Sequence, residues 1–237
     1  MAVAKAVLPG GLTLRQENNV FKLGQDSVLL GHFARPKARG KAVDLGAGAG
    51  VLSLILLGRF PEIHVTAVEL DAQAAALCDG NRRDNDLQGR MRVIRGDLRD
   101  RAALPPHATM DYAICNPPYF DPGSGAAHRR LAPARQDGGC TAADAAKAAA
   151  FCLKQGGKCA MVYRPERLPA LLRAFESAGL TPKRLRFVHQ RVDAAPSVAL
   201  LEGMKGAREG LAVLPPLLVQ KTDGCLTEEY KQIYKIE

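Results

Sequence analysis

Short apolar runs alternate with longer amphipathic stretches over most of this chain. The runs have the length of buried strands, and the stretches between them are long enough for helices of several turns. The predicted strands cover residues 42–45, 64–69, 91–97, 110–115 and 158–163, and the predicted helices cover residues 51–60, 72–84, 142–154 and 165–178. Strands that alternate with helices in this way predict an α/β fold with a doubly wound, mostly parallel sheet.

The C-terminal third departs from this alternation. Two predicted strands, residues 184–189 and 197–202, follow each other with no helix between them. Adjacent strands joined directly favour an antiparallel hairpin at the edge of the sheet. The polar tail over residues 217–237 predicts one more strand and a loose terminus.

The N-terminal segment shows strand-like alternation before the first buried strand. Residues 12–16 and 20–23 alternate apolar and polar side chains, which predicts a hairpin that turns between them. Asp26 or Ser27 is expected to cap a short helix over residues 28–33.

The length of the chain sets its domain organisation. At 237 residues it is long enough for one sizeable α/β domain and too short for two large ones. No repeat or low-complexity linker interrupts the pattern, so residues 1–237 are expected to form a single domain. Residues 1–40 would be its lead-in and residues 41–237 its core.

Cysteine spacing and apolar run length bear on the compartment. The six cysteines show no C-x-x-C spacing and no companion histidines, so no metal site is expected and a cytosolic chain with reduced thiols fits best. The longest apolar run, residues 51–57, is far shorter than a bilayer span, and no apolar leader follows Met1. Neither a membrane segment nor a signal peptide is expected.

A glycine-rich loop lies between the first buried strand and its helix. It begins at Asp44 and carries Gly46, Gly48 and Gly50. Glycine lets the backbone turn sharply and approach a ligand, and the helix N-terminus behind it is electropositive. Glu69 follows at roughly the spacing of about twenty residues at which a carboxylate meets ribose hydroxyls. The loop predicts a nucleoside cofactor, either a dinucleotide or S-adenosylmethionine.

The tetrapeptide Asn116-Pro117-Pro118-Tyr119 follows the strand over residues 110–115. The side-chain oxygen of Asn116 and the carbonyl of Pro117 are two acceptors for the hydrogens of an exocyclic amine. Prolines fix φ and donate no N–H, so they hold these acceptors rigidly. Tyr119 and Phe120 are expected to stack on a flat base. The alternative is a proline turn that closes the strand, with Tyr119 in the core.

With these motifs together, the chain resembles the class I S-adenosylmethionine methyltransferases, which implies a Rossmann-like, seven-stranded sheet ending in an antiparallel hairpin. The resemblance implies that the loop from Asp44 to Gly50 takes the methionine part, Glu69 the ribose and Asp97 the adenine edge. Two neighbours of these acidic residues, Leu70 and Leu98, are included in the cofactor site. A turn cap is the alternative role for Asp97.

Asn-Pro-Pro-Tyr resembles the signature of the amino-methylating branch, which acts on adenine N6, guanine N2 or protein glutamine. Release-factor glutamine enzymes carry a helical domain before the glycine loop, and adenine DNA enzymes generally carry a target-recognition domain. The chain is most similar to bacterial tRNA adenine-N6 methyltransferases that modify the adenine beside the anticodon of a valine tRNA. The lead-in over residues 21–30 strengthens this resemblance, which implies that Gln25 and Asp26 line the cofactor pocket; a helix cap is the alternative. Where the family has an acidic residue, Gln136 follows Arg135.

Positive charge is concentrated after the Asn-Pro-Pro-Tyr motif. Of a net charge of +9, residues 123–200 hold thirteen Lys and Arg against five Asp and Glu, a surplus of eight. Phosphate contacts supply much of nucleic-acid affinity, so we expect an RNA footprint here, with an ordinary solvated basic surface as the alternative. The expected phosphate contacts are His128, Arg129, Arg130 and Arg135, extended by Arg184, Arg186 and Arg191.

The sequence therefore predicts an S-adenosylmethionine-dependent adenine-N6 methyltransferase acting on structured RNA, with tRNA favoured because loop adenines are already unstacked. A guanine-N2 or protein-glutamine methyltransferase, a small-molecule methyltransferase and a non-catalytic RNA-binding protein of the same fold remain alternatives.

Overall fold

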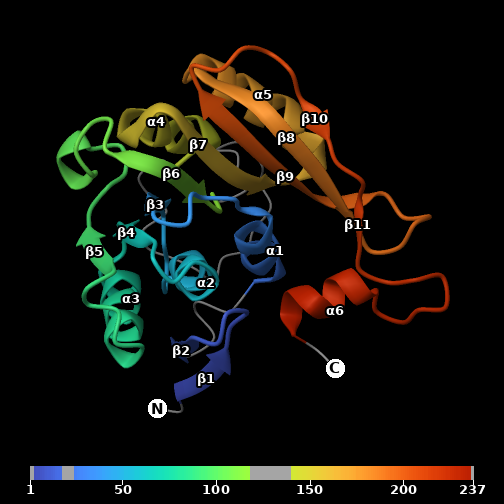
Figure 1. Cartoon of the computed structure of the whole chain (residues 1–237), viewed down its shortest axis with the longest axis horizontal. Helices are drawn as coiled ribbons and strands as arrows, with labels where there is room; N and C mark the ends of the chain where they lie inside the picture. Colours follow the sequence, from blue (N-terminus) through green and yellow to red (C-terminus); the bar gives the residue numbers. More distant parts are fainter. Residues whose placement is uncertain (1–2, 18–23, 118–139, 236–237) are drawn as a thin grey trace, which may run out of the picture.

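The computed structural model describes residues 3–17, 24–117 and 140–235, and within them a single large sheet is flanked by helices (Figure 1). The strands are β1 (Val3–Val7), β2 (Thr13–Glu17), β3 (Lys41–Leu45), β4 (His64–Glu69), β5 (Met91–Arg95), β6 (Met110–Cys115), β7 (Leu153–Tyr163), β8 (Leu180–His189), β9 (Pro196–Lys205), β10 (Ala212–Val213) and β11 (Leu217–Leu218). The helices are α1 (Gln25–Phe33), α2 (Val51–Arg59), α3 (Ala72–Asp84), α4 (Ala142–Cys152), α5 (Leu168–Ser177) and α6 (Glu228–Tyr234), with 3-10 turns at Arg101–Ala103 and Pro165–Arg167.

The sheet has the doubly wound, mostly parallel arrangement that the sequence predicted. Seven longer strands lie in the order β5-β4-β3-β6-β7-β9-β8. The first five are parallel, and β9 pairs antiparallel with both β7 and β8. Within the described residues this sheet has nine strands rather than seven, because β10 and β11 each add two residues beside β8, while β1 and β2 form a separate two-stranded sheet. Strands this short leave no alternation in the sequence.

Side-chain alternation along the strands separates two hydrophobic cores. In β6, Tyr112 and Ile114 belong to one core, whereas Ala113 and Cys115 belong to the other. The first core is covered by α1, α2 and α3, and the second by α4 and α5 (Figure 1). Both faces of the strands are therefore buried, as expected for parallel strands.

The first helices differ in how they begin. Asp71 caps α3 by accepting from the Ala74 amide at 2.8 Å. α1 begins at Gln25 behind an extended Gly24, and no side chain caps it. The expectation that Asp26 or Ser27 would cap this helix is therefore wrong. Both residues lie within its first turn, and the Ser27 hydroxyl is directed to another partner.

The described residues form an N-terminal hairpin that the sequence did not predict. β2 pairs antiparallel with β1, which precedes it, and the turn lies between Val7 and Thr13. Gly10 and Gly11 both have positive φ in this turn. The strand predicted over residues 12–16 corresponds to β2, and its described partner is the Val-Ala-Lys-Ala-Val run upstream of the glycines. The predicted partner strand over residues 20–23 lies outside the described residues.

The C-terminal tail contains a helix where a loose terminus was expected. Thr227 caps α6 by accepting from the Tyr230 amide at 3.2 Å, and Glu228 and Glu229 occupy its first turn. Ile233 is buried against the first core. This Thr-Glu-Glu start is a helix signal that the polarity of the tail obscured. In the described part of the chain, no helix is both long and apolar enough to span a bilayer.

Candidate active site

Four predicted site residues lie at the ends of neighbouring parallel strands. Asp44 lies in β3 and Glu69 ends β4, while Asp97 follows β5 and Asn116 follows β6. These strands are adjacent in the order β6-β3-β4-β5. After β3 the chain adds β4 and β5 on one side and then β6 on the other, and ligands of α/β sheets bind at such a reversal. The fold thus brings the four residues to one edge.

The glycine loop connects β3 to α2 with an open side. Gly46 and Gly48 have φ of 73° and 55°, and a Cβ added at either would meet no atom within 4 Å. Positive φ makes glycine the suitable residue here, and the open side leaves room for a ligand. Gly50 is different, since a Cβ there would lie 2.8 Å from the Cys78 sulfur. Its small size lets α2 pack closely on α3.

Asp44 is fully buried behind this loop. Its Oδ2 accepts from the backbone amide of Ser53 at 3.0 Å and from the Ser53 hydroxyl at 2.7 Å. Its Oδ1 is also buried and has no hydrogen-bond partner among the described residues. Burial raises the pKa of Asp44 to about 7, although the Ser53 hydrogen bonds oppose the shift. A buried carboxylate with one unpartnered oxygen fits a cationic donor such as an ammonium group.

Glu69 fixes the loop against the second strand. Its Oε2 accepts from the Gly48 amide at 2.7 Å, and its Oε1 accepts from the Asp71 amide at 2.8 Å. Each carboxylate oxygen has a second lone-pair direction, so ribose hydroxyls can still bind. Leu70, the next residue, is 47% exposed, so its side chain is accessible at the site.

Asp97 lies beside Glu69 but already has a strong partner. The Gly96 amide donates to the Glu69 carbonyl at 2.9 Å and ties the two strand ends together. The Asp97 carboxylate accepts from the Arg99 amide at 2.9 Å and from its guanidinium at 2.6 Å, and this pairing lowers the pKa of Asp97. An aspartate that accepts from the amide two residues later caps a turn, which is the alternative role given above for Asp97. Leu98 points into the second core, so its backbone is the part left for an adenine edge.

Asn116 is the first residue after β6, at the same sheet edge as the other site residues. In the β3–β6 pairing Ile114 lies opposite Asp44, so Asn116 follows two residues past the carboxylate that opens the glycine loop. Its Nδ2 donates to the Ser27 hydroxyl of α1 at 3.0 Å. The amide nitrogen thus faces α1, and the amide oxygen points away from Ser27. Pro117 is buried next to it.

Gln25 is placed at the start of α1, where it is exposed. Its side-chain amide donates to the Tyr230 hydroxyl of α6 at 3.2 Å, so this described contact is with the C-terminal helix and not with the glycine loop. The other predicted substrate residues lie outside the described residues: Pro118, Tyr119, Phe120, His128, Arg129, Arg130 and Arg135.

Comparison with known families matches this arrangement. The family model described as the methyltransferase small domain matches residues 11–188, a span that contains the glycine loop and all four strand ends. The chain belongs to this family.

Named relatives of this methyltransferase small domain protein share one description. Proteins named tRNA1(Val) (adenine(37)-N6)-methyltransferase are similar to it in Shewanella baltica, strain OS195 (33% identical over 141 residues), and in Tolumonas auensis (32% identical over 187 residues). The first match covers 59% of each protein, and the second covers 78% of this chain and 77% of the relative. The chain thus spans less than two thirds of the Shewanella relative.

Solved structures share the fold of this chain at lower identity. A protein from Agrobacterium tumefaciens described as a predicted O-methyltransferase superposes with a TM-score of 0.73 at 21% identity, covering 88% of this chain and 95% of that one. Pyrococcus horikoshii TYW2 in complex with MeSAdo gives a TM-score of 0.61 at 16% identity, covering 86% and 72%.

Three polar residues that organise the candidate site were not identified as doing so from sequence. Ser53 binds Asp44, and Ser27, considered only as a cap, binds Asn116. Asn81 is fully buried and donates to the Ala49 carbonyl of the glycine loop at 2.9 Å, while its oxygen accepts from the Arg15 amide at 2.7 Å. Asn81 was detectable, because it continues the buried face of α3 formed by residues 74, 77 and 78. A polar residue on that face must have partners.

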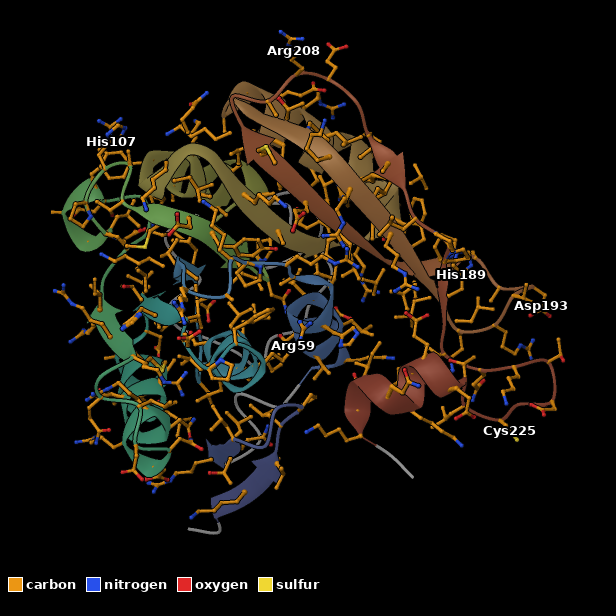
Figure 2. The ribbon with its side chains drawn as sticks, in the orientation of Figure 1. Arg59, His107, His189, Asp193, Arg208 and Cys225 are labelled. Atoms are coloured by element: carbon orange, nitrogen blue, oxygen red, sulfur yellow. The ribbon has the colours of Figure 1, made fainter. Side chains whose placement is uncertain are left out.

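The arginines expected to extend the phosphate track are bound within the fold. Arg184 pairs at 3.0 Å with Glu202, which is buried, and Arg186 pairs at 2.7 Å with Glu229. Arg191 pairs at 3.2 Å with Asp193, on the loop labelled in Figure 2. These carboxylates offset the positive charge, so the three side chains do not form a free cationic track.

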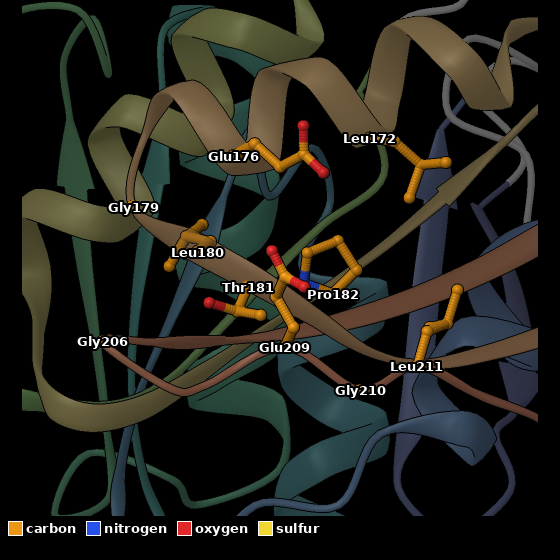
Figure 3. Close-up of a pocket in the computed structure, with 10 residues that line it drawn as sticks. All are labelled: Leu172, Glu176, Gly179, Leu180, Thr181, Pro182, Gly206, Glu209, Gly210 and Leu211. Atoms are coloured by element: carbon orange, nitrogen blue, oxygen red, sulfur yellow. The ribbon is translucent and has the colours of Figure 1, made fainter.

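A cavity of about 520 Å³ lies away from the strand ends (Figure 3). It opens between α5, the first residues of β8 and the loop over residues 206–211, and its described lining includes Leu172, Pro182 and the carboxylates of Glu176 and Glu209. None of the strand-end residues is among the described lining. The candidate active site is therefore the glycine-loop edge of the sheet and not this cavity.

Proposed function

We propose that this chain transfers a methyl group from S-adenosylmethionine to the N6 amine of an adenine in structured RNA, with tRNA near the anticodon as the favoured substrate. The observation that carries the proposal is the Asn116 amide, which follows β6 at the same sheet edge as the glycine loop. The names of the Shewanella and Tolumonas relatives support adenine as the target. The proposal treats residues 1–237 as one catalytic domain acting in the cytosol.

The residues at the sheet edge fit S-adenosylmethionine. The open side of the glycine loop admits a ligand, and the buried Oδ1 of Asp44 offers an acceptor to the ammonium of the methionine part. Glu69 would hold the ribose hydroxyls with its remaining lone pairs. Leu70, the Leu98 backbone and Asp97 would border the adenine. Gln25, at the start of α1, would line this pocket.

Bound S-adenosylmethionine supplies an electrophilic methyl group on a positively charged sulfonium. The N6 lone pair of adenine is conjugated into the ring, so it must be freed before it can attack. The Asn116 oxygen and the Pro117 carbonyl would accept the two N–H groups, draw the nitrogen toward sp³ geometry and aim its lone pair. Tyr119, with Pro118 and Phe120, would hold the ring. Positioning of this kind removes much of a barrier, and the extra proton leaves afterwards, so no strong base is needed.

RNA suits this proposal better than duplex DNA. A loop adenine is already unstacked, so its entry costs less than extrusion from a duplex. His128, Arg129, Arg130 and Arg135 follow the tetrapeptide closely and would meet the phosphates that flank the target base.

Product analysis tests the proposal. The purified protein is incubated with labelled S-adenosylmethionine and total RNA, and the RNA is digested to nucleosides. We expect label in N6-methyladenosine. Label in N2-methylguanosine would instead support the guanine-N2 activity, and cofactor binding without any transfer to RNA would count against an RNA methyltransferase.

The Asn116→Ala variant tests the proposed role of Asn116 in methyl transfer. We expect turnover to fall by about 100-fold or more, since misplaced reactants lose this much, while the affinity for S-adenosylmethionine stays near normal. The measurements are initial rates and calorimetric titration. Retained turnover would exclude the proposed role of Asn116.

A further inference from the structure

One polar contact at the site has no place in the chemistry described so far. The Nδ2 of Asn116 donates to the Ser27 hydroxyl at 3.0 Å across 89 residues of sequence. Both residues are half-buried, between α1 and the end of β6. Ser27 does not cap its helix, because α1 begins behind Gly24 with no side-chain cap. The hydroxyl therefore serves the amide rather than the helix.

The helix that carries Ser27 is held firmly on the sheet side. Val28, Leu29 and Leu30 are buried in the first core, and a Cβ at Gly31 would lie 2.7 Å from the Ile55 side chain of α2. At the other end of α1, the Arg59 guanidinium donates to the carbonyls of Gly31 and of His32, and Figure 2 labels Arg59 beside this helix. The Ser27 hydroxyl is therefore held at a fixed position beside the amide.

We propose that Ser27 is a positioning residue that sets the orientation of the Asn116 amide in the methyl-transfer site. This inference rests on the proposed function and deepens it. An amide rotated by 180° would present two N–H donors, in place of an acceptor, to an amine that is itself a donor. The Ser27 hydroxyl accepts from the amide nitrogen, so it holds the nitrogen on the α1 side and turns the oxygen away from α1, the orientation that the proposed methyl transfer requires.

Kinetics of three variants test the positioning role. We expect Ser27→Ala to lower kcat roughly fivefold to tenfold, the range set by the loss of one neutral hydrogen bond. The KM for S-adenosylmethionine and the KM for RNA should stay within about twofold of the parent values. Ser27→Thr keeps the hydroxyl and should restore most of the rate. The matched control is Ser177→Ala, an exposed serine of helix α5 on the other face of the sheet, which should change nothing.

A second readout does not depend on activity. The side-chain NH2 signals of Asn116, assigned by their loss in Asn116→Asp, are followed by NMR without RNA. We expect slow hydrogen exchange from them in the parent and in Ser27→Thr, and faster exchange in Ser27→Ala. If Ser27→Ala does not fold, Ser27→Cys replaces it, with a weaker acceptor and an intermediate effect expected in both readouts.

The two readouts separate the inference from the function on which it rests. If the parent makes no N6-methyladenosine, the proposed function fails, and the NMR result alone decides whether Ser27 orients the amide. Unchanged Asn116 signals in Ser27→Ala, or Ser27→Thr as impaired as Ser27→Ala in both readouts, would overturn the inference. An unchanged kcat for Ser27→Ala in an active parent would overturn it as well.

Discussion

At the scale of single residues, the burial of Asp44 carries the most chemical consequence. Its carboxyl group is removed from water, and this burial raises its pKa to about 7 although the hydrogen bonds from Ser53 oppose the shift. Its other oxygen has no partner among the described residues. The group therefore changes charge near neutral pH, and its proposed ligand is a cation. Cofactor binding and protonation of Asp44 should compete.

We predict that the affinity for S-adenosylmethionine falls as the pH drops below about 7, approaching tenfold per unit, because protonation removes the charge that attracts the ammonium. Binding near pH 7 should release a proton. Calorimetry from pH 5.5 to 8, in buffers of different ionisation enthalpy, measures both effects. The control is Asp44→Asn, which should bind weakly with little dependence on pH. An affinity independent of pH in the parent would contradict this prediction.

The same shift has a consequence for the stability of the free protein. The folded pKa lies above the unfolded value of 3.8, so the folded state binds the proton more tightly. The stabilisation is full below about pH 4 and is lost as the pH rises through about 7. It amounts to as much as about 4 kcal/mol. Unfolding by denaturant at several pH values should show this decline in the parent but not in Asp44→Asn.

At the scale of elements, sequence periodicity located the central sheet well. The strand over residues 64–69 and the helix over residues 72–84 have the predicted bounds, because both are bordered by clear turn or cap residues. Two elements were missed, one in a short N-terminal run and one where polarity misleads. β1 precedes the glycines of its turn, and α6 lies in a polar tail with one buried face. Tertiary contacts decide such cases, and they are not encoded in local pattern.

The helix that was missed, α6, contacts the first turn of α1. Besides the bond from Gln25 to Tyr230, the Tyr234 hydroxyl donates to the Gln25 carbonyl at 3.4 Å. Glu229 ties α6 to the sheet through two hydrogen bonds with Arg186, at 2.7 and 2.8 Å. α6 therefore links β8 to the first turn of the helix that bears Ser27.

We predict that Glu229→Gln increases hydrogen exchange in α6 and in the first turn of α1, by about threefold to fivefold, because a paired carboxylate contributes up to about 1 kcal/mol at such a surface. Glu228→Gln is the matched control. It removes an equal charge from the same helical turn but breaks only the longer contacts of 3.5 and 3.7 Å to Lys231 and Lys221. Mass-spectrometric exchange on peptides covering both helices measures the difference. Equal effects of the two variants would show that charge alone matters.

At the scale of the whole molecule, the sequence located the site by topology but not its internal contacts. Residues after consecutive parallel strands must share an edge, so Asp44, Glu69, Asp97 and Asn116 could be grouped from their positions alone. The partners of these side chains could not be predicted in the same way. Ser27 reaches Asn116 only because α1 folds back over the sheet, and Asn81 reaches the glycine loop only because α3 packs beside it.

The net charge of the sequence likewise did not show which cations have carboxylate partners in the fold. The surplus of eight positive charges after the tetrapeptide is a property of the sequence, but Arg184, Arg186 and Arg191 each have a carboxylate partner. The proposed RNA contact therefore falls to the cations that follow Tyr119 directly.

We predict that Arg129→Ala combined with Arg130→Ala weakens RNA binding. The slope of the logarithm of the binding constant against the logarithm of the salt concentration should become shallower by roughly 1.4, since each phosphate contact to single-stranded RNA contributes about 0.7. The control is Arg191→Ala combined with Asp193→Ala, which removes an exposed ion pair without changing the net charge and should leave the slope unaltered. Binding of a tRNA anticodon stem-loop is measured between about 50 and 200 mM salt, the range over which counterion release is resolved. An unaltered slope in the first variant would assign the phosphate contacts elsewhere. A slope reduced equally by the control would place phosphate contacts at Arg191, in the segment between β8 and β9.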